Sequence, residues 1–230
     1  MQRLLWTLLL PLFVALIGAG LPRAQAGDKD WVPIFNGKDI EGWKIEYGGK
    51  DDGWVAIFNG QDLEGWKIGY GNKKINETNS TWKVVDGVIV GEGEVSHLFS
   101  PRDDYVNFEA KSEIMISDKG NSGFYFRTKF GPGFPAGYEA QVNATHGDPV
   151  RTGSIYNHVK IFKQLHKADE WFSYHLKVQG NRIWVTVNGE LLYEYVDQAS
   201  TYKTGHFAFQ QHNLGSVVKI RKLEVKELKK

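Results

Sequence analysis

Apolar and polar residues alternate along most of the chain beyond residue 80, which is the pattern of half-buried β-strands. Predicted strands are Trp82–Val85, Val88–Gly91, Asn107–Ser117, Trp171–Gln179, Arg182–Val187, Glu190–Tyr195 and Val217–Glu227. Turn signals such as Asp86-Gly87 and Asn188-Gly189 separate several of them. No window of about 12 residues has a convincing helical period, and Tyr156–His166 is the only weak candidate. We therefore predict an all-β fold, an antiparallel sandwich or jelly roll.

Four further segments place polar, reactive side chains on one face of a predicted strand. They span residues 121–127, 138–141, 152–156 and 206–212. Neighbouring side chains of a strand point to opposite faces, so each segment has two distinct faces. One face carries Phe124, Phe126, Tyr138, Ala140, Ile155, Phe207 and Phe209, and the other carries Tyr125, Arg127, Glu139, Gln141, Ser154, Tyr156, His206, Gln210 and His212. Because a solvated sheet face usually carries Lys, Glu and Thr, the second set predicts a polar cleft backed by a phenylalanine-rich core.

The first 26 residues have the pattern of a cleavable secretory signal. Arg3 precedes an apolar run from Leu4 to Gly20, and Ala24-Gln25-Ala26 is a small-x-small cleavage site. The run is short for a membrane span, so a retained anchor is the lesser alternative. We expect a mature protein from Gly27 that is secreted or periplasmic, with no membrane association after cleavage.

A near-identical repeat follows the predicted signal. Residues 31–48 recur as residues 54–71, with 14 of 18 aligned positions identical. Two copies are too few for a solenoid, so a duplicated strand-turn element is the better interpretation. The second copy leads directly into the predicted sheet and should occupy the native place, whereas the first lies on an edge, exchanges with the second or stays loose. The predicted division is a signal peptide over 1–26, the duplicated element with its linker over 27–53, and a jelly-roll domain carrying the site over 54–230.

The composition removes several classes of function. There is no cysteine, which excludes disulfides, thiol nucleophiles and thiolate metal sites. Of the 28 basic and 27 acidic residues, the signal contains only Arg3 and Arg23, so the mature chain carries a net charge near −1. This balance argues against a nucleic acid or an anionic membrane as the partner.

The polar face offers groups suited to chemistry on a small polar molecule. Arg127 is a fixed cation whose planar fork can hold an enolate or carboxylate oxygen, or form a structural ion pair with Glu139. Glu139 can act as a base, an acid or a metal ligand, and His212 can transfer a proton near neutral pH. Tyr156 can donate a hydrogen bond to an oxyanion or merely stack. Substrate-binding groups are predicted at Asn121, Tyr125, Gln141 and Gln210.

Several familiar catalytic patterns are missing from the sequence. It contains no Gly-x-Ser-x-Gly, no His-Glu-x-x-His and no phosphate loop. Glu139 has no carboxylate two or four residues away, whereas retaining glycosidases need two carboxylates about 5 Å apart. Ordinary double-carboxylate glycoside hydrolysis is therefore disfavoured. His146, His158 and His166 fall in loops or at strand ends, where we expect them to face solvent, although His158 is close to Tyr156 in sequence.

The motifs, taken as a set, resemble one known family. They are Phe58-Asn-Gly-x-Asp-Leu-x-Gly-Trp66, Trp82 with Asp86-Gly-Val-Ile89, Asn121-Ser-Gly-x-x-x-Arg127, Tyr138-Glu-x-Gln141, Thr152-Gly-Ser-Ile-Tyr156, Gly205–His212 and Lys222–Leu228. Their order over residues 54–228 resembles the 3-keto-disaccharide hydrolase domain, also described as 3-keto-glucoside-1,2-lyase/3-keto-2-hydroxy-glucal hydratase. The resemblance implies a concanavalin-like jelly-roll sandwich of two antiparallel sheets, exported by bacteria. The duplicated first element and a longer, less glycine-rich segment after Gln210 depart from the family pattern.

The chemistry that this resemblance implies is cleavage of a 3-keto-glycoside with net hydrolysis. A ketone at C3 acidifies the proton on C2, a base removes that proton, the aglycone leaves from C1, and water then adds. On this basis the base is His212 or Glu139, Arg127 with Tyr156 stabilises the enolate, and Gln141 and Gln210 hold hydroxyls. No cofactor is evident, and a divalent cation bound through Glu139 and His212 is a further way to stabilise the enolate.

Two other functions are compatible with the same residues. A lectin-like jelly-roll module would hold a carbohydrate with the same aromatic and polar groups and do no chemistry. A structural envelope protein would pack its polar face against a partner. Turnover of a 3-keto-disaccharide would distinguish the enzyme from both.

Overall fold

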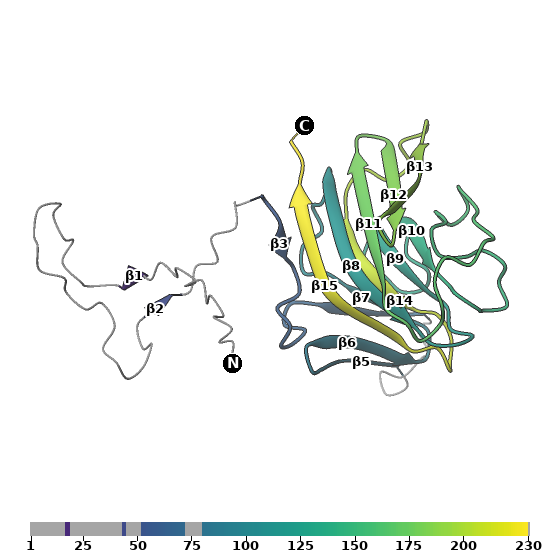
Figure 1. The fold of residues 1–230 in the computed structure, drawn as a ribbon, viewed down its shortest axis with the longest axis horizontal. Coiled ribbons are helices and arrows are strands. Elements are labelled where there is room, and N and C mark those ends of the chain that lie inside the picture. Colours follow the sequence, from purple (N-terminus) through teal and green to yellow (C-terminus); the bar gives the residue numbers. More distant parts are fainter. Residues whose placement is uncertain (1–16, 19–42, 45–51, 72–79, 230) are drawn as a thin grey trace, which may run out of the picture. The chain divides into compact units, whose positions relative to one another are not determined.

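The computed structural model describes residues 17–18, 43–44, 52–71 and 80–229 (Figure 1). It separates Met1–Asp52 from Gly53–Lys230. In the first unit, β1 (Ile17–Gly18) pairs antiparallel with β2 (Trp43–Lys44). Apart from these strands, the predicted signal and the first copy of the repeat lie outside the described residues. Over the described ranges no helix is long and apolar enough to cross a membrane.

The second unit consists of antiparallel strands in two sheets. Its strands are β3 (Val55–Ala56), β4 (Lys67–Tyr70), β5 (Ser80–Val85), β6 (Val88–Gly93), β7 (Ser96–Phe99), β8 (Phe108–Ile116), β9 (Ser122–Thr128), β10 (Tyr138–Val142), β11 (Phe172–Gln179), β12 (Arg182–Val187), β13 (Glu190–Val196), β14 (His206–Gln211) and β15 (Val218–Glu227). The five-stranded sheet has the order β10-β9-β14-β7-β4. The eight-stranded sheet has the order β13-β12-β11-β8-β15-β6-β5, with β3 paired to β15. The prediction of two antiparallel sheets in an all-β fold is confirmed.

The seven strands predicted from alternation are all present, but two other expectations differ from the structure. Residues 152–156 do not form a strand, because Ile155 makes only isolated bridges, to Ala140 and Val159. The weak helical candidate Tyr156–His166 contains turns and no helix. Gly153 and many polar side chains in residues 152–166 favour turns over a regular ladder.

The second copy of the repeat contributes a strand to each sheet. Its first strand, β3, pairs with β15 of the eight-stranded sheet, and its second strand, β4, pairs with β7 of the five-stranded sheet. Phe58, which lies between them in the chain, is buried in the hydrophobic core. The second copy therefore connects the two sheets at one side of the sandwich.

Aromatic side chains from both sheets fill the core. Phe124 of β9 stacks on Phe209 of β14 with ring centroids 4.8 Å apart and an interplanar angle of 13°. Phe207 of β14 meets Phe108 of β8 edge to face, with centroids 4.7 Å apart. All four rings are fully buried. Phe124 of β9 and Phe207 and Phe209 of β14 all point into this core. The side chains next to them along the two strands must therefore point to the opposite face of the five-stranded sheet.

Replacing Phe124 by alanine should lower the free energy of unfolding by about 3–5 kcal/mol, because the change removes a fully buried, stacked ring and leaves a cavity. Leu191 is 60% exposed, so Leu191→Ala serves as a control that should cost less than about 0.5 kcal/mol. Urea denaturation of both variants measures the difference. Equal stability of the two variants would contradict the described core.

Candidate functional site

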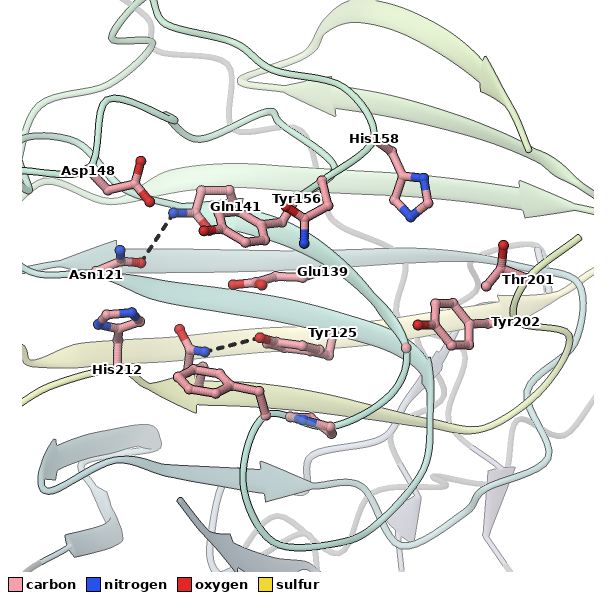
Figure 2. Close-up of a pocket in the computed structure, with 15 residues that line it drawn as sticks. Asn121, Tyr125, Glu139, Gln141, Asp148, Tyr156, His158, Thr201, Tyr202 and His212 are labelled. Atoms are coloured by element: carbon pink, nitrogen blue, oxygen red, sulfur yellow. Dashed lines mark hydrogen bonds between the residues drawn. The ribbon is translucent and has the colours of Figure 1, made fainter. Parts of the chain in front are cut away.

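The face of the five-stranded sheet that points away from the core carries a cavity of about 510 Å³ (Figure 2). This volume lies within the range of small-molecule sites, roughly 300–1,000 Å³. Seven residues singled out from the sequence line it: Asn121, Tyr125, Glu139, Gln141, Tyr156, Gln210 and His212. The lining is completed by Phe134, Pro135, Gly137, Asp148, Asn157, His158, Thr201 and Tyr202.

Strand pairing places Glu139 at the floor of the cavity. Glu139 of β10 lies directly opposite Tyr125 of β9, and Gln141 lies opposite Gly123. A Cβ atom added to Gly123 would overlap the Glu139 carboxylate oxygen Oε1 and lie 2.8 Å from its Cγ. The glycine therefore leaves the space into which the Glu139 side chain extends across β9.

The environment of Glu139 favours its neutral form. Burial raises the pKa of its carboxyl to about 7, the nearby Asp148 carboxylate adds to the rise, and a hydrogen bond with Tyr125 opposes it. Glu139 is nevertheless only partly buried and lines the cavity. It can therefore give or take a proton near neutral pH at a surface that a ligand can reach.

A chain of hydrogen bonds extends behind Glu139 into the sheet. Gln210 Nε2 lies 3.0 Å from the Tyr125 hydroxyl and 3.3 Å from His97 Nε2. An amide nitrogen can only donate, so the Tyr125 oxygen and His97 Nε2 accept, and the Tyr125 hydroxyl is free to donate to Glu139. Burial lowers the pKa of His97 to about 3, with a further contribution from His212, so the ring is neutral with its proton on Nδ1.

His97 is a residue that the sequence reasoning missed. It lies on β7, a short strand of four residues that the alternation pattern did not identify. Its ring is fully buried and meets the Tyr125 ring edge to face, with centroids 5.1 Å apart. The available signal was parity within Ser96–Phe99, because Leu98 belongs to the core and His97 therefore faces the other way.

Hydrogen bonds also define which nitrogen carries the proton in two other histidines, His212 and His146. His212 Nδ1 lies 3.1 Å from the Asn213 side-chain oxygen, which can only accept, so Nδ1 is protonated and the neutral ring has its lone pair on Nε2. His146 Nδ1 accepts the backbone N–H of Asp148 at 3.0 Å, so its proton lies on Nε2. The two rings pack edge to face with centroids 5.6 Å apart.

Amide groups complete this polar end of the cavity. Gln141 Nε2 donates to the Asn121 side-chain oxygen at 3.3 Å (Figure 2). The Asn121 amide nitrogen lies 3.3 Å from His146 Nδ1. The side-chain oxygens of Gln141 and Gln210 are buried without a hydrogen-bond partner in the described part of the chain. Unsatisfied buried acceptors at a cavity suit a ligand that brings hydroxyl donors.

Arg127 does not line the cavity, which differs from its expected place beside Glu139. Its guanidinium donates to three backbone carbonyl oxygens: Val106 at 2.9 Å, Gly180 at 2.8 Å and Tyr202 at 3.1 Å. The physical reason is a β-bulge, in which Phe126 and Arg127 of β9 together oppose Phe207 of β14. Arg127 has a φ of 48°, so the alternation of faces breaks at this residue.

The loop histidines differ in their surroundings. His158 is exposed and lines the cavity, with Nδ1 2.9 Å from the Tyr195 hydroxyl. His146 is partly buried beside His212, as described above. His166 stacks on the core residue Phe172 with centroids 3.9 Å apart, so the expectation of a solvent-facing ring is wrong there. Among the described residues no group of three or more His, Asp or Glu side chains could hold a metal ion.

Comparison with known proteins gives one family and several similar structures. The family model of the 3-keto-alpha-glucoside-1,2-lyase-like domain matches residues 53–226. A structure from Parabacteroides distasonis ATCC 8503, described as a candidate glycosyl hydrolase, is 26% identical with a TM-score of 0.64, covering 77% of this chain and 94% of its own. A second one from that organism has 21% identity, a TM-score of 0.62, and coverages of 76% and 99%.

The similarity extends to binding modules at the level of the fold. The carbohydrate-binding module CBM66 of Bacillus subtilis is 17% identical with a TM-score of 0.52, covering 71% of this chain and 96% of its own. At that identity the likeness shows a common sandwich fold, in agreement with the predicted jelly roll. No curated protein gives a significant match to the sequence.

Replacing Glu139 by glutamine should stabilise the protein at pH 8 but not at pH 4.5. Because the pKa of Glu139 is about 7 in the folded state and 4.5 is the ordinary value, the folded state binds the proton more tightly. The free energy of unfolding of the wild type therefore falls as pH rises from 4.5 to 7, and the glutamine variant escapes that loss. The expected gain at pH 8 is on the order of 2 kcal/mol.

Urea denaturation at both pH values measures this difference. Glu190 is exposed, so Glu190→Gln is a matched control that should shift stability by less than about 0.5 kcal/mol at either pH. A Glu139→Gln variant that is less stable than the wild type at pH 8 would show that the carboxylate is stabilised in its charged form.

Proposed function

The chain belongs to the 3-keto-alpha-glucoside-1,2-lyase-like family, and we propose that it cleaves 3-keto-glycosides by elimination across C1 and C2 followed by hydration. Family membership makes it a carbohydrate-active protein, similar to structures described as candidate glycosyl hydrolases. The observation that carries the proposal is a single cavity lined by both a group that can give a proton and a group that can accept one. Glu139 is held towards its protonated form, and His212 has its free lone pair on Nε2.

In the elimination, His212 is the base and Glu139 is the acid. His212 Nε2 takes the proton from C2, which the neighbouring C3 ketone acidifies, and the electron pair forms the C1–C2 double bond as the C1–O bond breaks. The Glu139 carboxyl gives its proton to the departing oxygen. This is the division of labour expected when burial keeps one carboxyl neutral near pH 7.

The hydration returns both groups to their starting states. The Glu139 carboxylate takes a proton from the water that adds to C1, and the protonated His212 returns a proton to C2. The net reaction is hydrolysis of the glycosidic bond. A second carboxylate is not needed, because the C3 ketone makes an enolate available in place of an oxocarbenium ion.

Neutral donors at the cavity suit the charge that develops on the C3 oxygen. Burial raises the pKa of Tyr156, with additions from Asp148 and Glu139, so its phenol remains a donor at neutral pH. The Asn121 amide, a second donor, is oriented by the hydrogen bond that its side-chain oxygen accepts from Gln141. Aimed at the enolate, such donors stabilise the transition state more than the ground state. In this scheme Arg127 takes no part, because its donors are already engaged by backbone carbonyls.

We further propose that the protein acts outside the cytoplasm. The support is the sequence pattern of residues 1–26, with Arg3, the apolar run Leu4 to Gly20 and the small-residue cleavage site. The sequence contains no cysteine, so an oxidising compartment would not change its covalent structure through thiol oxidation.

The role of Glu139 predicts a dependence on the leaving group. Glu139→Gln should reduce elimination of a 3-keto-disaccharide by about 10²–10⁴-fold, because a sugar alkoxide leaves poorly without a proton. With 4-nitrophenyl 3-keto-glucoside the loss should be below about tenfold, because that leaving group needs no acid. His212→Gln should slow the elimination of both substrates. Product analysis by NMR should also show the unsaturated sugar accumulating with Glu139→Gln, because hydration has lost its base.

Two outcomes would contradict this scheme. Equal losses with both substrates in Glu139→Gln would exclude Glu139 as the acid for the leaving group. Tight binding of the 3-keto-disaccharide by the wild type with no turnover would identify a lectin-like binding module instead. His175→Gln is a control, since His175 pairs with Glu109 on the other sheet.

The pH dependence of the reaction provides a separate prediction. As the acid, Glu139 must be protonated, so kcat/KM for the disaccharide should fall as pH rises through about 7. This fall of kcat/KM with pH should be absent when Glu139→Gln is assayed with the 4-nitrophenyl substrate. Steady-state rates between pH 5 and 9 measure it. A rate that instead rises through pH 7 in the wild type, with the rise lost in Glu139→Gln, would assign Glu139 the role of base.

A further inference from the structure

The cavity extends well beyond the groups that the proposed chemistry uses. His158, Thr201 and Tyr202 lie at the end of the cavity opposite to Asn121, Asp148 and His212, with Glu139 and Tyr125 between the two groups (Figure 2). We call this end the Tyr202 end, made of His158, Thr201 and Tyr202. These residues line the same cavity but have no part in the proton transfers described above.

Aromatic packing makes the wall at the Tyr202 end rigid. The Tyr202 ring meets the buried ring of Tyr138 edge to face, with centroids 5.0 Å apart and an interplanar angle of 88°. The His158 ring packs on the same Tyr138 ring at 5.6 Å and is tethered to the Tyr195 hydroxyl. Tyr202 is partly buried, whereas His158 and Thr201 are exposed, so this end opens to solvent.

The backbone of the same wall is held from both sides. Tyr202 O accepts a hydrogen bond from Arg127 Nη1 at 3.1 Å, and Tyr202 N donates to the Tyr138 hydroxyl at 3.4 Å. The Asp197 carboxylate accepts the Thr201 N–H at 2.8 Å and the Tyr138 hydroxyl at 2.5 Å. Such anchoring of exposed loop residues to buried groups reduces the entropy lost when a ligand binds.

The chemistry of the Tyr202 end suits an uncharged ring that carries hydroxyls. Its three side chains offer a phenol, a hydroxyl and an imidazole, and they include no carboxylate, ammonium or guanidinium. The aromatic surface can cover the C–H face of a sugar ring, while the polar atoms bond its hydroxyls. The opposite end holds the Asp148 carboxyl and His212, and Glu139 lies between the two ends, so the opposite end is the better match for the reacting 3-keto ring.

We propose that the Tyr202 end is the subsite for the leaving group, and that it binds a second, neutral sugar ring. The inference rests on the proposed function, since it takes Glu139 as the acid between the two rings. It assigns Tyr202 as a residue that determines specificity and Arg127 as the residue that positions it. The open end then lets the released sugar depart while the reacting ring is still held.

Substrates that differ only in the leaving group test this subsite. Tyr202→Ala should lower kcat/KM for a 3-keto-disaccharide by about tenfold or more, because ring contacts of this size carry that much discrimination. With methyl 3-keto-glucoside, which has no second ring, kcat/KM should change by less than about twofold. Tyr202→Phe should keep most of the disaccharide rate if the ring face carries the binding. Phe162 is 63% exposed and outside the cavity lining, so Phe162→Ala is the matched aromatic control and should change neither rate.

The proposal fails if Tyr202→Ala leaves the disaccharide rate unchanged, or lowers both rates equally. If the wild type turns over neither substrate, the proposed function fails, and titration calorimetry then tests the subsite by itself. In that case the wild type should bind the 3-keto-disaccharide at least about tenfold more tightly than methyl 3-keto-glucoside, and Tyr202→Ala should abolish the difference. Equal affinities in the wild type would overturn the subsite.

Discussion

The alternation of side chains across the five-stranded sheet is the constraint on which both the core and the cavity depend. In β9, β10 and β14, alternate residues pack into the aromatic layer. The cavity is lined by residues that lie between them, namely Tyr125, Glu139, Gln141 and Gln210. Phe124 and Tyr125 are neighbours in the chain, yet one is a core residue and the other lies beside Glu139. A one-residue slip of β9 would exchange the two faces and remove the core and the cavity together.

The electrostatic character of the cavity follows from where the cationic side chain of β9 goes. A guanidinium beside Glu139 would have favoured the carboxylate and lowered its pKa. The β-bulge instead turns Arg127 towards backbone carbonyls, and the histidine behind Tyr125 is kept neutral by burial. Burial is therefore the largest influence on Glu139 and outweighs the hydrogen bond with Tyr125, which is why its pKa rises.

Much of this arrangement could be predicted from the sequence, because strand parity needs no knowledge of which strands pair. Parity alone separates Glu139 and Gln141 from Tyr138 and Ala140, and the structure brings the polar members of three strands together. Parity fails at Arg127, because a bulge is a property of two paired strands, and the pattern of one strand does not reveal it. His97 was missed because β7 is too short to show a period. Asp148, Thr201 and Tyr202 reach the cavity from loops, whose paths depend on tertiary hydrogen bonds.

The three carbonyls that Arg127 holds come from segments far apart in the chain. They precede β8, form the hairpin between β11 and β12, and precede β14. Opening any one of them would leave a buried charge less completely solvated, which is costly, so the three segments should resist opening separately. Arg127 thereby makes them one cooperative unit, whose amide hydrogens would exchange with solvent together. Local fluctuations at the far hairpin and at the cavity wall are then a single event.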